Sequence, residues 1–201
     1  MIPTYETTTT ACGRRRRPAR GFTLVEMLTV MALVVIVMGI ALPAIDVARF
    51  RLDGEVQSLA LMINSSQRLA VLRQYDIVLA FDESEDRIRL HHDENNDGVM
   101  DSGEELRFIQ LEEEVVFGRG GADALPEGGD EITFTERQDG LPSMTFRRNG
   151  SASETGVIYL TSLVASRTSG HSEHTRAIAI ERATGQVTCL SYRTSDWEIG
   201  C

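Results

Sequence analysis

Short motifs that indicate an enzyme are absent from this chain. It has no G-x-S-x-G nucleophile elbow, no phosphate-binding glycine loop and no H-E-x-x-H or C-x-x-C metal motif near His91, His92, His171 or His174. A serine, a histidine and an aspartate occur in any chain of this length, so their presence indicates no active site. The stretch SGHSEHTR, which holds His171 and His174, is typical of an exposed polar loop. We therefore expect a protein that is not an enzyme.

Basic residues are few relative to acidic ones. The chain has 20 Lys and Arg against 30 Asp and Glu, a formal net charge of −10. It also lacks a basic stripe interleaved with aromatic residues, the usual footprint of a nucleic-acid surface. A surface of this sign repels phosphate backbones and favours solubility, so we expect no nucleic-acid partner. Internal repeats are absent as well.

One long apolar run is present, residues 22–45, with the sequence FTLVEMLTVMALVVIVMGIALPAI and Glu26 as its only charge. As a helix it would reach about 36 Å, enough to cross a hydrocarbon core of about 30 Å. Five arginines precede it: Arg14, Arg15, Arg16, Arg17 and Arg20. Because positive flanks stay in the cytoplasm, residues 1–20 are predicted inside and everything after Ile45 outside.

Two other interpretations of this apolar run are a cleaved secretory signal peptide and a plain signal anchor. A cleaved secretory signal peptide has a shorter apolar core, ends in small residues and contains no carboxylate, which does not fit. A plain signal anchor fits the length and the flank. It gives no reason for Glu26, whose charge within a membrane costs about 2.5–3.5 kcal/mol on insertion scales. A cost of this size indicates a partner for the carboxylate.

The hexapeptide Gly21-Phe22-Thr23-Leu24-Val25-Glu26 resembles the class III signal of type IV pilins and type II secretion pseudopilins. The resemblance implies that a prepilin peptidase cleaves between Gly21 and Phe22 and methylates the new amino terminus. It also implies that Glu26 pairs with the terminal amine of a neighbouring subunit and sets register during assembly. Pro43 falls at the family's usual proline position, where the missing N–H loosens the helix.

Removal of the leader changes the cysteine count and the charge. Cys12 would leave with residues 1–21, which carry a net charge of +4, so the mature chain would have a charge of −14. Cys189 and Cys201 would remain as a pair in an oxidising compartment. We expect them to form a disulfide worth about 3 kcal/mol in the chain-entropy model, the alternative being two unpaired thiols.

The periodicity of the sequence predicts an α+β fold. Helical spacing continues after the apolar run through Leu52, Val56, Leu59, Ile63, Leu69, Val71 and Leu72, so one long helix is expected over about 22–74. Its outer half is amphipathic, which favours packing on a sheet over a groove for a partner. Short β-rich runs follow at 77–81, 87–91, 106–111, 115–117, 132–134, 144–146, 157–160, 176–180 and 186–190. We expect an antiparallel, sandwich-like head, with 118–130 as a mobile surface loop and Arg147-Arg148-Asn149-Gly150 as a turn.

Three phrases in this region, SSQRLAVLRQYDIVLAF, MTFRRNGSAS and RAIAIERATGQV, resemble the GspH/FimT-type pseudopilins. The resemblance implies a pilin-like fold in which the helix enters a β-sandwich and a hairpin lies near the C-terminus. DNA-uptake pilins of the FimT type carry Gly-Arg-x-Arg in this hairpin. Here Gly185 is followed by Gln186, Val187 and Thr188, so both arginines are missing and direct DNA capture is disfavoured.

The segment 93–104 has the pattern of a twelve-residue calcium loop. Oxygen-bearing side chains fall at positions 1, 3, 5, 9 and 12, a glycine at position 6 and a carbonyl at position 7: Asp93, Asn95, Asp97, Asp101, Glu104, Gly98 and Val99. An EF-hand has flanking helices, whereas this loop lies between predicted strands. Clusters of Asp, Asn and Gly also form ordinary Asx turns, so both interpretations stay open. Calcium is the one cofactor that the sequence suggests.

These observations give four segments: a cytoplasmic leader (1–21), a transmembrane and assembly helix (22–45), its amphipathic continuation (46–75) and a periplasmic head (76–201). The leading hypothesis is a minor pseudopilin of a type II secretion system in the bacterial inner membrane. Its expected partners are other pseudopilins, the prepilin peptidase and an inner-membrane assembly platform. The alternatives are a minor type IV pilin similar to FimT or FimU, and a membrane-anchored calcium-binding domain. Whether Trp197 anchors the core or an interface stays open.

Overall fold

The computed structural model describes residues 21–41, 46–168 and 170–201. Contacts divide the chain into two units, Met1–Ile45 and Asp46–Cys201, which are described separately. Several predictions lie outside the described residues: the five leader arginines, Cys12 and Pro43.

The expected long helix is divided into two. Helix α1 covers Leu24–Ala41 and helix α2 covers Val47–Arg73. Asp46 is not helical, with φ −78° and ψ 89°, and its side chain accepts a hydrogen bond from the Arg49 N–H at 3.1 Å. This is a helix N-cap, which satisfies one of the free N–H groups of a new first turn. The prediction of one uninterrupted helix was therefore wrong at Asp46, whereas the end of α2, capped by Gln74, agrees with the sequence.

The amphipathic character of α2 is confirmed. Its buried residues recur at intervals of three and four: Leu52, Val56, Leu59, Ile63, Ser66 and Ala70. Val71 and Leu72, which the sequence assigned to the same stripe, are exposed. The register that begins at Leu52 places Ala70 on the buried face, so its two neighbours point outward.

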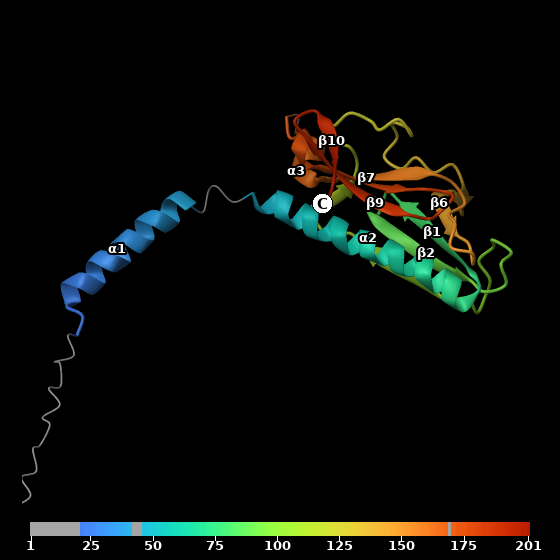
Figure 1. Cartoon of the computed structure of the whole chain (residues 1–201), viewed down its shortest axis with the longest axis horizontal. Helices are drawn as coiled ribbons and strands as arrows, with labels where there is room; N and C mark the ends of the chain where they lie inside the picture. Colours follow the sequence, from blue (N-terminus) through green and yellow to red (C-terminus); the bar gives the residue numbers. More distant parts are fainter. Residues whose placement is uncertain (1–20, 42–45, 169) are drawn as a thin grey trace, which may run out of the picture. The chain divides into compact units, whose positions relative to one another are not determined.

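The head contains two antiparallel sheets (Figure 1). The first has the order β3-β2-β1-β6-β5 and the second β10-β9-β8-β7-β4. The strands of the first sheet are β1 (Asp76–Asp82), β2 (Arg87–Asp93), β3 (Leu106–Gln110), β5 (Arg137–Gln138) and β6 (Leu141–Phe146). Those of the second are β4 (Val115–Phe117), β7 (Gly156–Ser162), β8 (Thr175–Ile180), β9 (Val187–Arg193) and β10 (Asp196–Ile199). Helix α3 (Leu163–Arg167) and the 3-10 turn η2 (Ser172–His174) connect β7 to β8.

Helix α2 lies along the head and contacts strands of both sheets, so that helix and sheets share one core (Figure 1). Phe81 and Phe134 stack there with ring centroids 5.6 Å apart, and Phe117 meets Phe81 edge-on. The predicted fold class, a helix packed on an antiparallel β-sandwich-like head, is confirmed. A smaller cluster forms around Tyr159, to which Leu125 and Trp197 contribute, so Trp197 is an anchor within the head.

Eight of the nine predicted strands are present, with shifted ends. The run 132–134 is not a strand, since only Ile132 makes an isolated bridge to Ile158. Strand β10 was missed because its turn carries no glycine or asparagine. Thr194 and Ser195 both have positive φ, 49° and 72°, a conformation that hairpin turns usually give to Asn-Gly.

The segment 118–130 is irregular, as predicted, but it is packed onto the second sheet. The Leu125 N–H donates to the Tyr159 hydroxyl at 2.8 Å, and that hydroxyl donates to the Gly128 carbonyl at 3.1 Å. The Trp197 indole donates to the Asp123 carbonyl at 3.0 Å. At Gly120, with φ 51°, a Cβ atom would collide with the Thr161 hydroxyl. The segment is therefore a surface loop that these contacts hold to the second sheet, and its predicted mobility stays a prediction.

Candidate functional site

The predicted processing site lies at the start of the described chain. Gly21 and Phe22 precede α1, and Phe22 is 76% exposed. The Thr23 hydroxyl accepts a hydrogen bond from the Glu26 N–H at 3.2 Å, and the Glu26 carboxylate accepts one from the Thr23 N–H at 3.5 Å. This reciprocal pair is a capping box, which Thr-x-x-Glu signals in a sequence and which our sequence analysis did not consider. Glu26 thus has a local role in addition to the pairing predicted for it.

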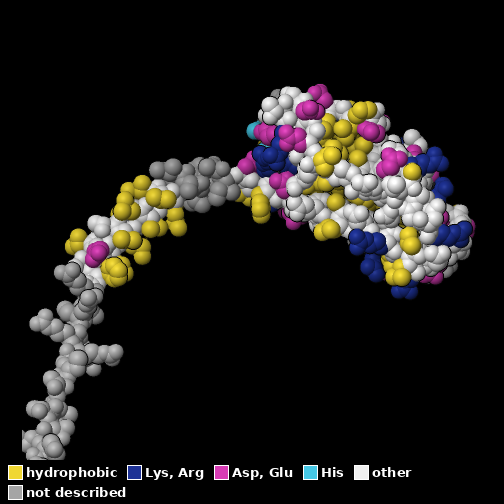
Figure 2. Space-filling view, in the orientation of Figure 1, with side chains coloured by type: hydrophobic (Ala, Val, Ile, Leu, Met, Phe, Trp, Pro, Cys, Tyr) yellow, Lys and Arg dark blue, Asp and Glu magenta, His cyan; other side chains and the backbone are white. Residues whose placement is uncertain are grey.

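The exposed surface of α1 is mostly apolar, and Figure 2 shows hydrophobic side chains along the face in view. Within α1, Glu26 is the single charged residue, and large aliphatic side chains from Leu24 to Met38 are exposed. None of the helices that the structure describes has the combined length and apolarity needed to cross a membrane. The predicted span reached Ile45, and residues 42–45 lie outside the described chain.

The predicted calcium loop connects β2 to β3 and is folded by its own side chains. The Asp93 carboxylate accepts hydrogen bonds from the N–H groups of Asp97 and Gly98, at 3.1 and 2.8 Å. The Asn95 amide donates to the carboxylates of Asp97 and Asp101, both at 3.0 Å. Asn95, Asp97 and Asp101 are therefore gathered around one point, and Asp93 shapes the backbone beside it. Gly98 has φ 77°, as the sharp turn at position 6 requires.

Glu104, at the last position of the loop, is held by a buried histidine. Its carboxylate lies 2.7 Å from Nε2 of His91, whose Nδ1 accepts a hydrogen bond from the Gln138 amide at 2.9 Å. The Asp101 N–H also donates to Glu104, at 2.9 Å. The backbone N–H of Asp101 and the bond from His91 hold the pKa of Glu104 below its usual value. Glu104 is thus oriented by the fold and carries a negative charge at neutral pH.

Only one group of three or more His, Cys, Asp or Glu side chains in the described part of the chain has ligand atoms that all lie within 4.8 Å of one another. That group is His171, Glu173 and His174, not the carboxylates of the 93–104 loop. His174 is 6% exposed, so placing it in an exposed loop was wrong. The signal that could have found this group is the spacing His171-x-x-His174, which eclipses two side chains on a 3-10 turn.

The predicted disulfide is present. Cys189 on β9 is bonded to Cys201, with Cα atoms 5.8 Å apart. The Cys201 carbonyl also accepts a hydrogen bond from the Gln57 amide of α2 at 3.3 Å. The end of the chain is therefore held to both the second sheet and α2.

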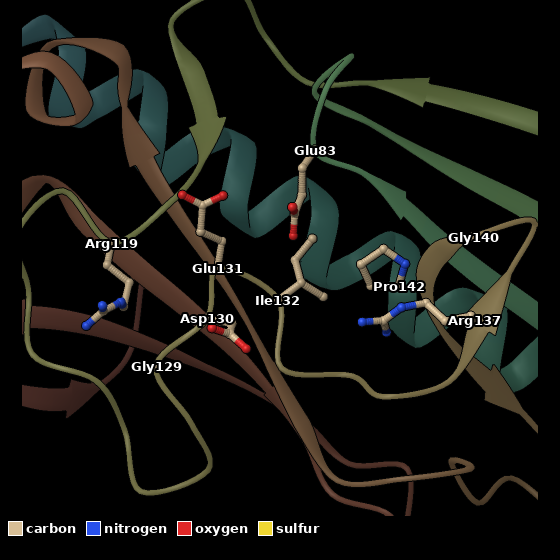
Figure 3. A pocket seen from close by; sticks show the side chains of 9 residues that line it. All are labelled: Glu83, Arg119, Gly129, Asp130, Glu131, Ile132, Arg137, Gly140 and Pro142. Atoms are coloured by element: carbon tan, nitrogen blue, oxygen red, sulfur yellow. The ribbon is translucent and has the colours of Figure 1, made fainter.

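A surface hollow of about 610 Å³ lies between the β1–β2 turn and the segment before β5 (Figure 3). Arg119 lies at one side near Asp130 and Glu131, and Arg137 at the other beside Pro142. Burial, together with the charges of Glu83 and Asp86, raises the pKa of Glu131. The residues that line this hollow carry both signs of charge and include no histidine, cysteine or hydroxyl side chain.

The hairpin β8–β9, where FimT-type pilins carry arginines, is fastened to α2. The Gln67 amide of α2 donates to the carbonyls of Gly150 and Thr184, at 2.7 and 2.8 Å. A Cβ atom at Gly185, with φ 63°, would collide with the Gly150 carbonyl and the Gln67 side chain. Gln67, Gly150 and Gly185 each belong to one of the three sequence segments that resemble GspH/FimT-type pseudopilins. These three segments therefore contact one another here.

Comparison with known proteins identifies a family motif in the N-terminal segment. Residues 16–42 match the family model "Prokaryotic N-terminal methylation motif", so the chain carries the N-terminal motif of prepilin-type proteins. No curated protein matches the chain.

Two solved structures of the minor pseudopilin EpsH from the type II secretion system of Vibrio cholerae are similar to this chain. One is 15% identical, covering 74% of this chain and 99% of its own, with a TM-score of 0.49. The other is 11% identical, covering 67% of this chain and 92% of its own, with a TM-score of 0.46. Identities this low say nothing of function, which has to be argued from the residues.

Proposed function

We propose that this chain is a minor pseudopilin of a type II secretion system. It is a structural subunit near the tip of a periplasmic pseudopilus that helps to export folded proteins across the outer membrane. The observation that carries the proposal is the match to the methylation motif over residues 16–42. This range contains Gly21 and Phe22 and the apolar helix α1 that begins at Leu24. Prepilin-type proteins are cut by a prepilin peptidase and assemble with one another through this helix.

The exposed surface of α1 supports assembly. A helix that is apolar on all sides has to be covered by lipid or by other apolar helices. The head cannot need α1 for its own core, because every buried apolar residue in the described chain comes from Leu52 onward. In the proposal, α1 is held in the inner membrane before assembly and packs against the helices of neighbouring subunits afterwards.

Glu26 is the polar group in this otherwise apolar contact. Its carboxylate lies at the first turn of α1, next to the position where cleavage after Gly21 would create a positively charged amine. Pairing with the amine of a neighbour compensates the buried charge, and each subunit then has one axial register in which this happens.

The head favours secretion over DNA uptake. Gln186, Val187 and Thr188 follow Gly185 in the terminal hairpin, so the arginines of the FimT type are missing. The charge of −14 after processing opposes a polyanion as well. The function proposed for the head is contact with other subunits and with cargo, without chemistry.

The first test compares secreted protein in the culture supernatant of a clean deletion strain with that of the same strain carrying the gene on a plasmid. We expect a loss of secretion that the plasmid restores and that a Gly21→Leu variant, blocked in processing, does not restore. Unchanged secretion in the deletion strain would contradict the proposal and favour a minor type IV pilin.

A second test addresses processing itself. Mass spectrometry of the mature protein should find methylated Phe22 at the amino terminus. An intact terminus at Met1 would exclude a pilin-type subunit and leave a plain membrane anchor.

We further propose that the 93–104 loop binds Ca²⁺ through Asp93, Asn95, Asp97, Asp101, Glu104 and the carbonyl of Val99. The convergence of Asn95, Asp97 and Asp101 and the orientation of Glu104 by His91 support this. Binding would require Asn95 to present its carbonyl oxygen in place of its amide. Affinity in the millimolar range is expected for an extracellular module. Calorimetry should detect binding that Asp97→Asn abolishes, and no heat at several millimolar calcium would refute it.

A further inference from the structure

Two histidines and two carboxylates lie together where the turn η2 meets the first residue of the head. His171 precedes the single turn of η2 and His174 is its last residue, and their ring centroids are 5.3 Å apart. The Glu173 carboxylate lies 3.7 Å from Nδ1 of His171 and 4.0 Å from Nε2 of His174. Asp46, the N-cap of α2, brings a carboxylate oxygen to within 2.6 Å of the same Nε2 atom. The ligand atoms of His171, Glu173 and His174 thus all lie within 4.8 Å of one another, and Asp46 contacts one of them, Nε2 of His174.

The turn that carries these side chains is held by its backbone. The His174 N–H donates to the His171 carbonyl at 2.9 Å, which closes the 3-10 turn and eclipses the two imidazoles. The His174 carbonyl accepts a hydrogen bond from the Thr161 hydroxyl at 2.8 Å, and the Glu173 carbonyl accepts one from the Arg176 guanidinium at 2.7 Å. These bonds place η2 against β7 and β8 without using the ligand atoms themselves.

The environment of His174 resembles that of a metal ligand. Its side chain is 7% exposed, and its Nδ1 lies 3.1 Å from the Ser162 hydroxyl on β7. When a metal occupies one imidazole nitrogen, the other usually donates to an oxygen that fixes the ring. Ser162 can accept that bond from Nδ1–H, which leaves the lone pair of Nε2 directed at the cluster. His171, Glu173 and Asp46 are each between 42% and 47% exposed, so an ion can enter from solvent.

We propose that His171, Glu173, His174 and Asp46 bind one transition-metal ion of the zinc class. Two imidazole nitrogens and two carboxylate oxygens form a donor set suited to Zn²⁺, whereas Ca²⁺ takes oxygen ligands alone. Tetrahedral zinc with bonds of about 2.0–2.1 Å places its ligand atoms about 3.3 Å apart. The contacts of Glu173 at 3.7 and 4.0 Å need to shorten by about 0.4 and 0.7 Å to reach this separation. The contact of Asp46 with His174, now a hydrogen bond at 2.6 Å, needs to lengthen.

The charge around the cluster permits a divalent cation. Asp46 and Glu173 supply two negative charges, which balance Zn²⁺ when both imidazoles are neutral. Arg176 and Arg49 are the nearby cations, and the Arg176 guanidinium is already paired with Asp53 at 2.6 Å. The site is independent of the 93–104 loop, whose ligands are all oxygens.

Metal binding would join η2 to the start of α2. In the metal-free protein the only bond between these ligand side chains across the two elements is that of His174 with Asp46. A bound ion would add His171 and Glu173 to the same link. Because the ion binds the folded arrangement and not the unfolded chain, it should raise the stability of the head.

The test uses the full chain in detergent, purified with a tag that contains no histidine and freed of metal with a chelator. Calorimetry with ZnCl₂ should show one ion per chain, and zinc should raise the melting temperature. His171→Ala and Glu173→Gln should each weaken binding at least about tenfold. Both side chains are half-exposed, and among the described residues they have no side-chain partner outside the cluster. The melting temperature without zinc should therefore stay close to that of the wild type. Asp46→Asn, which can still cap α2, should also weaken zinc binding.

His92→Gln is the matched control, because it removes a histidine outside the cluster and should bind zinc like the wild type. Absence of binding at millimolar zinc would overturn the proposal and leave the His174–Asp46 contact as a plain hydrogen bond. Binding that His171→Ala and Glu173→Gln leave unchanged would overturn it too, as would an equal loss in His92→Gln.

Discussion

At the scale of single residues, the most consequential charge in the head is Arg176. It is 1% exposed, and two nitrogens of its guanidinium contact Asp53 of α2 at 2.6 and 2.7 Å. A third nitrogen donates to the backbone carbonyls of Glu173 and Thr175. Burial lowers the pKa of Arg176 and the charge of Asp53 opposes that shift. The pair therefore fixes α2 to β8 only as long as both charges are present.

Replacement of Asp53 by asparagine should destabilise the head by about 3 kcal/mol, since the buried guanidinium would lose its counter-ion. The measurement is urea denaturation of residues 46–201, the unit that contains the described core. Glu114→Gln is the control, because it breaks the exposed ion pair with Arg51 and should cost less than about 1 kcal/mol. Equal losses of unfolding free energy in the two variants would show that the buried Arg176–Asp53 pair stabilises the head no more than an exposed ion pair does.

His92 should make stability depend on pH. It is 3% exposed, its Nδ1 lies 3.1 Å from the Tyr75 hydroxyl and 3.3 Å from a Glu105 carboxylate oxygen, and burial lowers its pKa from the usual value of 6.5. The unfolded chain then binds the proton more readily than the folded one. Stability from His92 is complete above about pH 6.5 and is lost as the pH falls below that value. Denaturation between pH 7.5 and 5.5 should show a smaller decline for His92→Gln than for the wild type. Parallel curves for the two proteins would contradict this assignment.

At the scale of elements, Gln67 connects α2 to two turns that are distant in sequence, one between β6 and β7 and one between β8 and β9. Its amide donates to the carbonyl of Gly150 in one turn and of Thr184 in the other. One side chain of α2 thus binds a carbonyl in each of two turns, and this contact fixes how α2 crosses both sheets.

Gln67→Leu keeps the size of the side chain and removes both donors. We expect a loss of about 2 kcal/mol in the unfolding free energy of residues 46–201, about 1 kcal/mol for each hydrogen bond. Gln57→Leu, on the same helix, removes the single 3.3 Å bond to Cys201 and should cost less than half as much. If Gln57→Leu lowered the unfolding free energy as much as Gln67→Leu, the two hydrogen bonds of Gln67 would not be what holds α2 in place.

Elements with a strong local pattern could be predicted from sequence, and those defined by distant contacts could not. The stripe from Leu52 to Ile63 and the runs that form β1 and β8 are set by periodicity and β-branched residues. Strand β10 depends on Thr194 and Ser195 adopting positive φ, which their side chains do not signal. The burial of His174 depends on Asp46 and Ser162, which are remote in sequence. The Asp46 cap was missed because the apolar pattern continues across it.

At the scale of the whole molecule, the chain consists of an apolar helix with its surface exposed and a head with its own core. The head holds its last residue with a disulfide and its first with a helix cap. In the described part of the chain, the core of this head contains no residue of α1, and the surface of α1 is mostly apolar. The polar exception on that surface, Glu26, then has two separate roles to distinguish: capping α1 and pairing with a neighbouring amine.

Three variants separate these roles of Glu26. Glu26→Gln keeps a side chain that can accept the Thr23 N–H bond but removes the charge. Thr23→Ala removes the cap and keeps the charge. Glu26→Val removes both. If the charge sets register, Glu26→Gln and Glu26→Val should be processed normally and fail to appear in sheared filament fractions, whereas Thr23→Ala should assemble.

The opposite pattern would assign Glu26 to the helix cap alone. In that case Glu26→Gln would assemble like the wild type, and Thr23→Ala would fail together with Glu26→Val. A cap is worth only about 1 kcal/mol, whereas a charge left uncompensated within the apolar region costs about 2.5–3.5 kcal/mol, and in Glu26→Gln that charge would be the neighbour's terminal amine. Because the larger energy belongs to the charge, we expect Glu26→Gln to be the variant that cannot be incorporated.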